Sequence, residues 1–366
     1  MKNIKVYLQY PWKVSDSQYY KSLIEFPPEN IKYQNIRKKE GMIINKKKLS
    51  IVNFLKRSIR NFLEEIQMPI LNIHKSPCQK DYEIIHCAHC LSKNKNKPWI
   101  ADFESPWQMF ISGRDTKKGN KKALKILMRN NCKKILAWTE KAEKEIISKF
   151  PEVKDKVEIV SFAIPVPKIK KNEHKGINLL FVSRYFHEKG GEHTLEAFRE
   201  LTKKYKNVKC IFISQTPKKI IKKYSSNNKI NFFDLIPHGK LIEEIFPKMD
   251  ILVYPAYSDT FGFIFVEAMS FGLPIITVDG FARKDIINEG KTGFIIEREK
   301  NNEWYPKEEE GKKIIEKLIE KTSLLIENKK LRKKMSNNCI KVIKEGKFSI
   351  KERNKRLKKI YSEVLK

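Results

Sequence analysis

Two carboxylates stand in an otherwise apolar part of the chain, with seven residues between them. They are Asp259 and Glu267. The surrounding pattern predicts a strand that ends at Pro255, a turn that carries Asp259 and Gly262, and a helix that runs to about Phe271. Backbone N–H groups at the start of a helix attract anions, so this turn is a candidate anion site.

The two carboxylates can accept hydrogen bonds from the hydroxyl groups of a ligand. Glu267 falls more than one turn into the predicted helix, where it can accept two hydrogen bonds from a ribose diol. Asp259, in the preceding turn, can hold a sugar hydroxyl. The ordinary alternative for Glu267 is a solvated helix residue. Its neighbours are apolar, however, and an unpaired buried carboxylate is costly. They are Phe263, Ile264, Phe265, Val266, Ala268 and Met269.

Two cations follow another predicted strand. The strand is 178–183, Arg184 comes directly after it, and Lys189 follows five positions later. A pair of glycines beginning at Gly190 precedes a helix that opens near Glu192. Ligands of parallel sheets bind at the carboxyl ends of the strands, where an arginine and a lysine can clamp a diphosphate. The alternative is an ordinary strand-to-helix turn with basic residues.

Short apolar runs alternate with long charged amphipathic ones, which is typical of parallel sheets in an α/β fold. The predicted strands of the first half are 4–9, 84–87, 99–103, 134–138 and 158–160. Those of the second half are 178–183, 209–214, 230–233, 251–254, 274–278 and 293–296. Helical patterns between them include 192–205, 241–247 and 311–328. Each half therefore predicts its own doubly wound domain, and 163–168, with two prolines, is the predicted linker.

Glycine is concentrated in the second half of the chain. Eleven of the fourteen glycines lie beyond residue 165. Glycine is needed where a backbone approaches a ligand closely or takes up a positive φ. This uneven distribution favours the second half as the place of a bound phosphate.

The charge of the chain is strongly positive. Its 366 residues include 76 Lys and Arg against 43 Asp and Glu, a formal net charge of +33. Such a charge favours a polyanionic partner, namely nucleic acid, anionic lipid or phosphorylated small molecules. A composition rich in Lys, Ile and Asn would raise the charge without any partner. Two basic segments, the amphipathic helix predicted for 45–66 and the run 114–134, suit an anionic membrane surface. An ordinary lysine-rich solvent face is the slightly favoured alternative.

Composition excludes several classes of protein. A hydrophobic content of 40% excludes wholesale disorder, and the length suggests about two domains. The six cysteines are too sparse for a small disulfide-rich secreted domain. The first residues read as a strand rather than a signal peptide, and the apolar stretch 261–278 is interrupted by Glu267 and Pro274. These features predict a reduced, cytoplasmic protein.

One cluster in the first half has residue types that bind zinc. It consists of His74, Cys78, His86, Cys87, His89 and Cys90. The paired Cys-x-x-Cys motif of a zinc ribbon is missing, and 84–87 has the pattern of a buried strand. The core strand is therefore the favoured interpretation and zinc the alternative.

Taken together, the motifs resemble glycosyltransferase family 4, also called group 1, of the glycosyltransferase-B type fold. The acidic residue, the spacing of seven and the Glu-Ala-Met sequence from Glu267 match the signature of this family. An upstream element matches 183–190, and a downstream element matches 285–294. The segment from Phe348, followed by a basic helix, matches the closing part of the family. The resemblance is strong from Asn178 to the C-terminus and covers the first half only in outline.

The resemblance implies roles for individual residues. Arg184 and Lys189 would neutralise the donor diphosphate and stabilise the departing nucleoside diphosphate without a metal or cofactor. Glu267 would bind the ribose, and Asp259 would orient the donor sugar. Glu104, or less favourably Asp102, falls where many relatives place an active-site histidine, and a helix or turn cap is the favoured alternative there. The remaining donor-binding residues would be Ser183, Gly190, Thr260, Phe261, Gly262 and Phe263.

It also implies an architecture and a reaction. Two Rossmann-like domains would face each other across a cleft, with an acceptor domain at 1–167, a donor domain at 168–347 and a helix at 348–366 that crosses back. The reaction would be transfer, with retention, of a hexose-type sugar from a nucleoside diphosphate sugar to a hydroxyl of a glycan or lipid-linked acceptor, in the cytoplasm or at the inner face of a membrane. A catalytically silent nucleotide-sugar-binding relative, or less favourably a nucleic-acid-binding protein, are the alternatives.

Two departures from the family pattern stand out. Asp259 is one methylene shorter than the glutamate usual at its position. The loop after the first predicted strand, 10–16, has no glycine, whereas the family often has a glycine-rich loop there.

Overall fold

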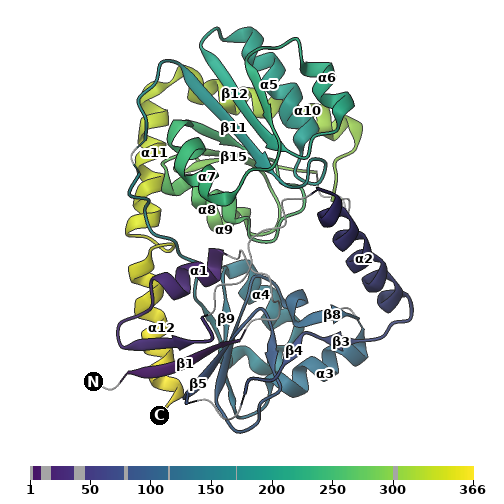
Figure 1. Cartoon of the computed structure of the whole chain (residues 1–366), viewed down its shortest axis with the longest axis vertical. Helices are drawn as coiled ribbons and strands as arrows, with labels where there is room; N and C mark the ends of the chain where they lie inside the picture. Colours follow the sequence, from purple (N-terminus) through teal and green to yellow (C-terminus); the bar gives the residue numbers. More distant parts are fainter. Residues whose placement is uncertain are drawn as a thin grey trace. The chain divides into compact units, whose positions relative to one another are not determined.

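The computed structural model describes residues 3–9, 18–36, 46–77, 81–113, 116–169, 171–299 and 304–366. Contacts between residues divide the chain into two units. The first comprises Met1–Ala163 together with Lys347–Lys366, and the second comprises Ile164–Gly346. Each unit is built around one parallel sheet with helices packed on it (Figure 1).

The first unit has a six-stranded parallel sheet in the order β10–β9–β7–β5–β1–β2. Its strands are β1 (Ile4–Gln9), β2 (Ile31–Gln34), β5 (Ile84–Ala88), β7 (Trp99–Phe103), β9 (Cys132–Ala137) and β10 (Val157–Ile159). Two short pairs accompany it, β3 (Ile70–Leu71) with β8 (Phe110–Ser112) and β4 (Ile73–His74) with β6 (Leu91–Ser92). The α-helices are α1 (Gln18–Glu25), α2 (Lys46–Glu65), α3 (Lys117–Leu127), α4 (Glu140–Lys149) and α12 (Ile350–Val364).

The second unit has a six-stranded parallel sheet in the order β13–β12–β11–β14–β15–β16. Its strands are β11 (Ile177–Ser183), β12 (Val208–Ser214), β13 (Ile230–Phe233), β14 (Ile251–Val253), β15 (Ile275–Val278) and β16 (Gly293–Ile296). The α-helices are α5 (Gly191–Lys204), α6 (Lys218–Tyr224), α7 (His238–Lys240), α8 (Phe263–Ser270), α9 (Arg283–Ile286), α10 (Glu308–Glu327) and α11 (Lys329–Lys344).

The structure confirms the predicted α/β class with two doubly wound, Rossmann-like sheets. Each predicted strand is present, with its ends within two residues of the prediction. The helix predicted for 241–247 was wrong in type, because the chain forms a π-helix at Leu241–Ile245 and a 3-10 helix at Phe246–Lys248. Proline has no N–H to donate and its ring crowds the preceding turn, so Pro247 stops regular α-helical bonding.

Helix α8 shows why a carboxylate is buried in the second unit. The helix is apolar on all sides, as expected of a helix inside a core rather than on a surface. Its buried residues are Phe265, Val266, Glu267, Ala268, Met269 and Ser270. The sequence of α8 therefore forces Glu267 out of bulk water.

Helix α2 was predicted as 45–66, close to the observed Lys46–Glu65. Several apolar side chains on and beside it are exposed to solvent, namely Phe54, Leu55, Ile59, Phe62 and Ile66.

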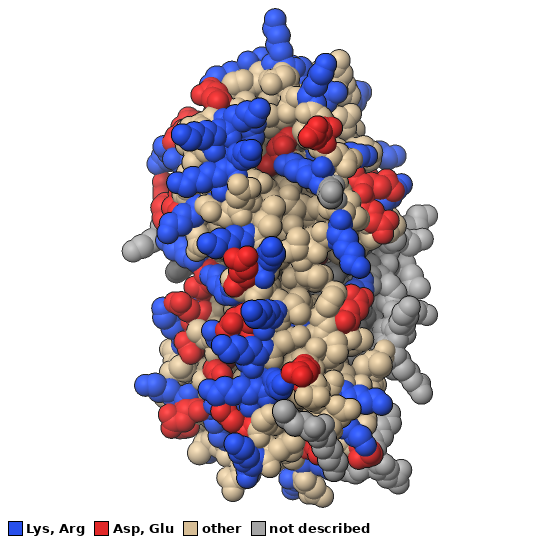
Figure 2. Space-filling model, turned by 90° about the vertical axis from the view of Figure 1, so that its left-hand side faces the viewer, with Lys and Arg blue, Asp and Glu red and all other residues tan. Residues whose placement is uncertain are grey.

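On the face drawn in Figure 2, lysine and arginine side chains predominate over acidic ones. Within the described residues, no helix has an apolar run long enough to span a bilayer.

Candidate functional site

The predicted cation Lys189 and the predicted carboxylate Asp259 form an ion pair. Lys189 Nζ lies 2.9 Å from Asp259 Oδ2, and both side chains are mostly buried. Lys189 belongs to the turn between β11 and α5, and Asp259 to the turn between β14 and α8. Because β11 and β14 are adjacent parallel strands, their carboxyl ends bring these turns together.

The environment of this pair is only partly hydrated. Burial lowers the pKa of the Lys189 ammonium below its usual value, and the Asp259 carboxylate partly opposes that effect. The Tyr254 hydroxyl donates to Asp259 Oδ2 at 3.4 Å. Asp259 Oδ2 also lies 3.5 Å from where a β-carbon on Gly262 would be, close to the start of α8. Asp259 thus brings the Lys189 ammonium close to the start of α8.

Backbone hydrogen bonds join the two turns. The Ala256 N–H donates to the Lys189 carbonyl at 3.1 Å, and the Ser258 N–H donates to the Glu188 carbonyl at 3.2 Å. The Lys189 ammonium also donates to the Ser258 carbonyl. These bonds fix the distance between the predicted phosphate-binding cation and the predicted sugar-binding acid.

The sequence pattern did not predict a role for Arg283, whose side chain contacts the turn that carries Asp259. The Arg283 side chain is 1% exposed, and its guanidinium donates to the carbonyls of Asp259 and Ala256. The guanidinium lies over the Phe265 ring, with Cζ 5.3 Å from the ring centroid. Burial lowers the pKa of Arg283, while the Asp259 carboxylate raises it. Arg283 thus fixes the turn of Asp259 through hydrogen bonds to its backbone carbonyls, and no local sequence motif predicts these bonds.

Gly190 lets the first turn approach the second closely. It has a φ of +76° and caps α5. A β-carbon here would lie 2.8 Å from Pro255 Cβ and 2.9 Å from Tyr257 Cε2, both parts of rigid rings. Only glycine therefore fits this position without displacing the neighbouring turn.

We expect Gly190→Ala to destabilise the protein by about 2–4 kcal/mol, from positive φ and overpacking together. Gly290→Ala is the matched control, because Gly290 also has a positive φ of +68° but has open space around its Cα. It should cost only about 1–2 kcal/mol. Chemical unfolding of both variants measures the difference. Equal losses would show that the close contact at Gly190 carries no energy.

Glu267 is buried and hydrogen-bonded. Its side chain is 8% exposed, and His238 Nε2 lies 2.9 Å from its Oε1. His238 begins α7, so a residue beyond β13 meets one beyond β14. Figure 1 shows α7, α8 and α9 grouped within the second unit. The sequence pattern predicted a buried Glu267 but did not identify His238 as its partner.

The other predicted donor-binding residues surround these contacts in different ways. Arg184 is half-buried and makes no ion pair with any residue that the structure describes. The Ser183 hydroxyl donates to the Tyr185 carbonyl at 3.1 Å, which shapes the turn after β11. The ring centroids of Phe261 and Phe263 lie 5.6 Å apart. Thr260 and Gly262 complete the turn, and Gly262 takes a φ of +79° at the start of α8.

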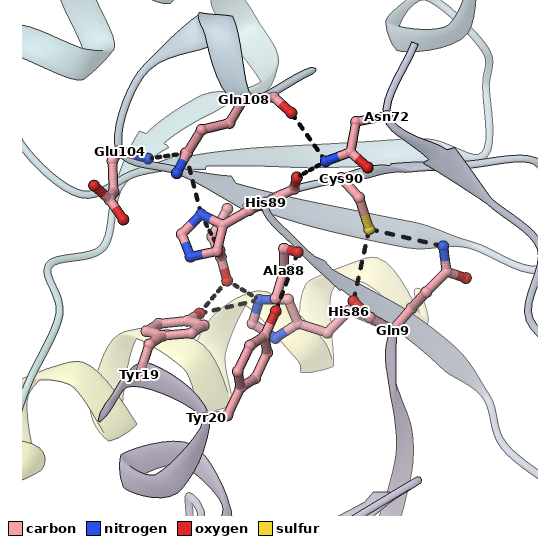
Figure 3. Close-up of polar contacts among 11 residues, drawn as sticks. Gln9, Tyr19, Tyr20, Asn72, His86, Ala88, His89, Cys90, Glu104 and Gln108 are labelled. Carbon is pink, nitrogen blue, oxygen red and sulfur yellow. Dashed lines mark hydrogen bonds and ion pairs between the residues drawn. The ribbon is translucent and has the colours of Figure 1, made fainter. Parts of the chain in front are cut away.

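Glu104 lies in the first unit, directly after β7. Its backbone N–H donates to Gln108 Oε1 at 2.8 Å. Figure 3 shows its carboxylate turned away from His89. His89 has a φ of +55° and its Nδ1 lies 3.1 Å from Gln108 Oε1. Sequence reasoning did not predict the contact of Gln108 with both residues.

The alternative candidate Asp102 is an internal residue of the first unit. It is 1% exposed, accepts a bond from His86 Nε2 at 2.7 Å and accepts another from the Tyr19 hydroxyl. His86 Nδ1 lies 2.7 Å from the hydroxyl of Tyr361 on α12. Burial raises the pKa of Tyr361 well above its usual value. This network ties α12 to the first sheet through Tyr361. Figure 3 shows its Tyr19 and His86 side chains turned toward each other.

The cysteines and histidines of the suggested zinc cluster have other surroundings. His86 is paired with Asp102, and burial raises the pKa of the Cys87 thiol, which disfavours the thiolate that metals bind. Cys78 lies outside the described residues. Elsewhere in the described ranges, no three or more His, Cys, Asp or Glu side chains are arranged to hold a metal ion.

Comparison with known proteins places this site in a family. Residues 166–342 match the family described as glycosyl transferases group 1, and they include the turns of Lys189 and Asp259 as well as Glu267. The second unit of the chain is therefore a group 1 glycosyltransferase domain. The resemblance inferred from the motifs is thereby confirmed.

Relatives of known name are distant. The capsular polysaccharide biosynthesis glycosyltransferase CapM of Staphylococcus aureus is 25% identical over 225 residues, which cover 57% of this chain and 53% of CapM. The lipopolysaccharide glucosyltransferase WaaG of Escherichia coli is 26% identical over 124 residues, 32% of each chain. The chain thus matches about half of CapM and a third of WaaG.

Solved structures extend the likeness to the whole fold. A glycosyltransferase from Rickettsia africae has a TM-score of 0.66 at 15% identity, with 100% of this chain and 99% of that chain covered. Anabaena HepE, solved with UDP and glucose, has a TM-score of 0.61 at 12% identity, with 99% and 100% covered. These values show the glycosyltransferase-B type fold.

Proposed function

We propose that this chain transfers a sugar from a nucleoside diphosphate sugar to a hydroxyl acceptor. The observation that carries the proposal is the convergence of Lys189 and Asp259 at the start of α8, the helix that also carries the buried Glu267. A cation beside a helix start suits a diphosphate, and a carboxylate further along the helix suits a ribose. The match of the second unit to the group 1 family and the UDP complex of HepE support this donor class.

The reaction breaks the bond between the sugar C1 and the diphosphate oxygen and forms a bond between C1 and the acceptor oxygen. The proton of the acceptor hydroxyl passes to the departing nucleoside diphosphate, which balances the charge. Lys189 and Arg184 would stabilise the negative charge that grows on the diphosphate. Asp259 would hold a sugar hydroxyl. Its ion pair with Lys189 keeps the Asp259 carboxylate in place for this contact. In the family this transfer retains the configuration at C1, and we propose the same here for a hexose-type sugar.

A screen of donor hydrolysis tests the proposal. We expect slow release of nucleoside diphosphate from one nucleotide sugar, with UDP-glucose and UDP-N-acetylglucosamine tried first and GDP sugars next. Replacement of Lys189 by methionine should slow the release about 100- to 1,000-fold. Binding of nucleotide sugars with no hydrolysis and no transfer to any acceptor would instead favour a catalytically silent relative.

We further propose that the acceptor is lipid-linked and that α2 binds an anionic membrane. The exposed apolar side chains on α2 include Phe54, Ile59 and Phe62, which lack a protein partner to cover them within the described residues. The segment 46–60 contains six basic residues and no acidic one. An apolar stripe on a basic helix matches an acidic lipid surface in both polarity and charge.

Flotation with vesicles tests the membrane proposal. The protein should float with vesicles that contain phosphatidylglycerol and remain below with pure phosphatidylcholine. Changing Ile59 and Phe62 together to serine should abolish flotation, whereas Phe233→Ser, an exposed apolar residue of the second unit, should not. Flotation that is indifferent to anionic lipid would overturn the proposal.

A further inference from the structure

The contact between His238 and Glu267 joins distant parts of the second sheet. His238 follows β13, and Glu267 lies on the helix that follows β14. Strands β12 and β11 stand between β13 and β14 in the sheet. Because the strands are parallel, the segment that leads to His238 and the turn that leads to α8 start at the same edge of the sheet, the edge of the carboxyl ends. This is the edge at which ligands of such sheets bind.

The contact also leaves Glu267 with capacity to bind a ligand. His238 Nε2 lies 2.9 Å from one carboxylate oxygen, Oε1. An ionised carboxylate has about four acceptor positions, so several remain for hydroxyl donors. At 8% exposure, the carboxylate would be strongly penalised without a partner. His238 thus gives the Glu267 carboxylate one hydrogen bond and leaves its other acceptor positions for a ligand.

The segment of His238 is fixed to α8 at a second point. Directly after α7, the chain forms the π-helix Leu241–Ile245, a rare element that is frequent at functional sites. Phe246 then stacks on Phe271 at the end of α8, with ring centroids 5.2 Å apart and planes inclined by 19°. The His238–Glu267 contact and the Phe246–Phe271 stack both attach this segment to α8 or its end. The position of the imidazole is therefore fixed more firmly than that of a histidine on a free, solvent-exposed loop.

We propose that His238 is a positioning residue for ribose recognition. Its Nε2–H donates to Glu267 Oε1 and fixes the rotation of the carboxylate, so that the remaining acceptor positions meet the two ribose hydroxyls. His238 therefore sets the preference of the site for ribonucleotides over deoxyribonucleotides. The inference rests on the proposed function, because it requires that Glu267 binds a ribose.

The test compares one nucleotide with its 2′-deoxy analogue. Calorimetry would measure UDP and 2′-deoxy-UDP on the wild type, His238→Ala and His238→Gln. Glutamine can still donate from its side-chain amide. Lys240→Ala is the matched control, because Lys240 lies on the same short helix but pairs at the surface with Glu244. If UDP does not bind to the wild type, the GDP pair replaces it.

We expect the wild type to prefer the ribonucleotide about tenfold or more, the effect of roughly one charged hydrogen bond. His238→Ala should weaken the ribonucleotide about tenfold and leave the deoxynucleotide unchanged, so that the preference disappears. His238→Gln should retain most of it, and Lys240→Ala all of it.

Equal weakening of both nucleotides by His238→Ala would overturn the inference, because it would indicate a structural role only. An unchanged preference would do the same. A wild type that binds neither nucleoside diphosphate would overturn the proposed function itself, and that outcome is distinguishable from the other two.

Discussion

Glu267→Ala is expected to weaken nucleoside diphosphate binding about 100-fold. The carboxylate would accept two ribose hydrogen bonds, and each bond to a charged group is worth about 1.5–3 kcal/mol. Such bonds would form with a side chain that is already desolvated, since Glu267 is 8% exposed. The loss should appear in the affinity for UDP or GDP themselves, measured by calorimetry, with no sugar or acceptor present.

Two further variants separate binding from folding. Glu267→Gln keeps the shape of the side chain and one acceptor oxygen, so we expect a smaller loss of about tenfold. Glu309→Ala removes an exposed carboxylate from α10 and should leave the affinity unchanged. Thermal unfolding identifies any variant that fails to fold. A Glu267→Ala protein that is folded and binds as tightly as the wild type would remove Glu267 from the site.

Lys189→Met is expected to lower turnover about 100- to 1,000-fold. Methionine keeps the length and apolar volume of the side chain but removes the cation that would face the departing diphosphate. Removing one group that stabilises developing charge in a buried site typically has an effect of this size. The affinity for the donor should fall less than turnover, because the charge on the diphosphate grows as the bond to the sugar breaks.

Comparison of kcat with kcat/KM for donor turnover measures this effect. Lys189→Arg keeps a cation and should recover part of the rate. Lys203→Ala, an exposed lysine on α5, is the control. A Lys189→Met variant that turns over within threefold of the wild type would show that the Lys189–Asp259 pair only supports the turn.

Much of the fold could be predicted because it follows from local chemistry. Apolar runs such as 178–183 can only be buried strands between charged helices, and the glycines before α5 and α8 mark turns with positive φ. The sequence did not indicate β2, whose four residues, Ile31–Gln34, form a short edge strand at the end of the first sheet. So short an alternation has no distinctive periodicity.

The candidate site was predictable where its residues lie in motifs and not where they meet across the chain. Lys189, Asp259 and Glu267 each stand out by type and spacing. Arg283 and His238 do not, because they act by reaching turns from other strands. A sequence pattern carries the residue type but not the partner that tertiary packing supplies.

The same limit applies to the first unit. Tyr361, five residues from the C-terminus, meets His86 on β5, and Arg353 donates to the Ser22 hydroxyl on α1. The partners are separated by 275 and 331 positions. Only the folded sheet brings such residues together, so the role of Asp102 as an internal hydrogen-bond acceptor could not be read from β7 alone.

A structure of the protein with a bound nucleoside diphosphate sugar would show whether the second unit binds its donor at the start of α8. It should place the ribose hydroxyls within hydrogen-bond distance of the Glu267 carboxylate and the diphosphate beside Lys189 at the start of α8. A nucleotide found elsewhere on the second unit, with the Lys189–Asp259 and His238–Glu267 contacts untouched by ligand, would contradict the assignment of the donor site.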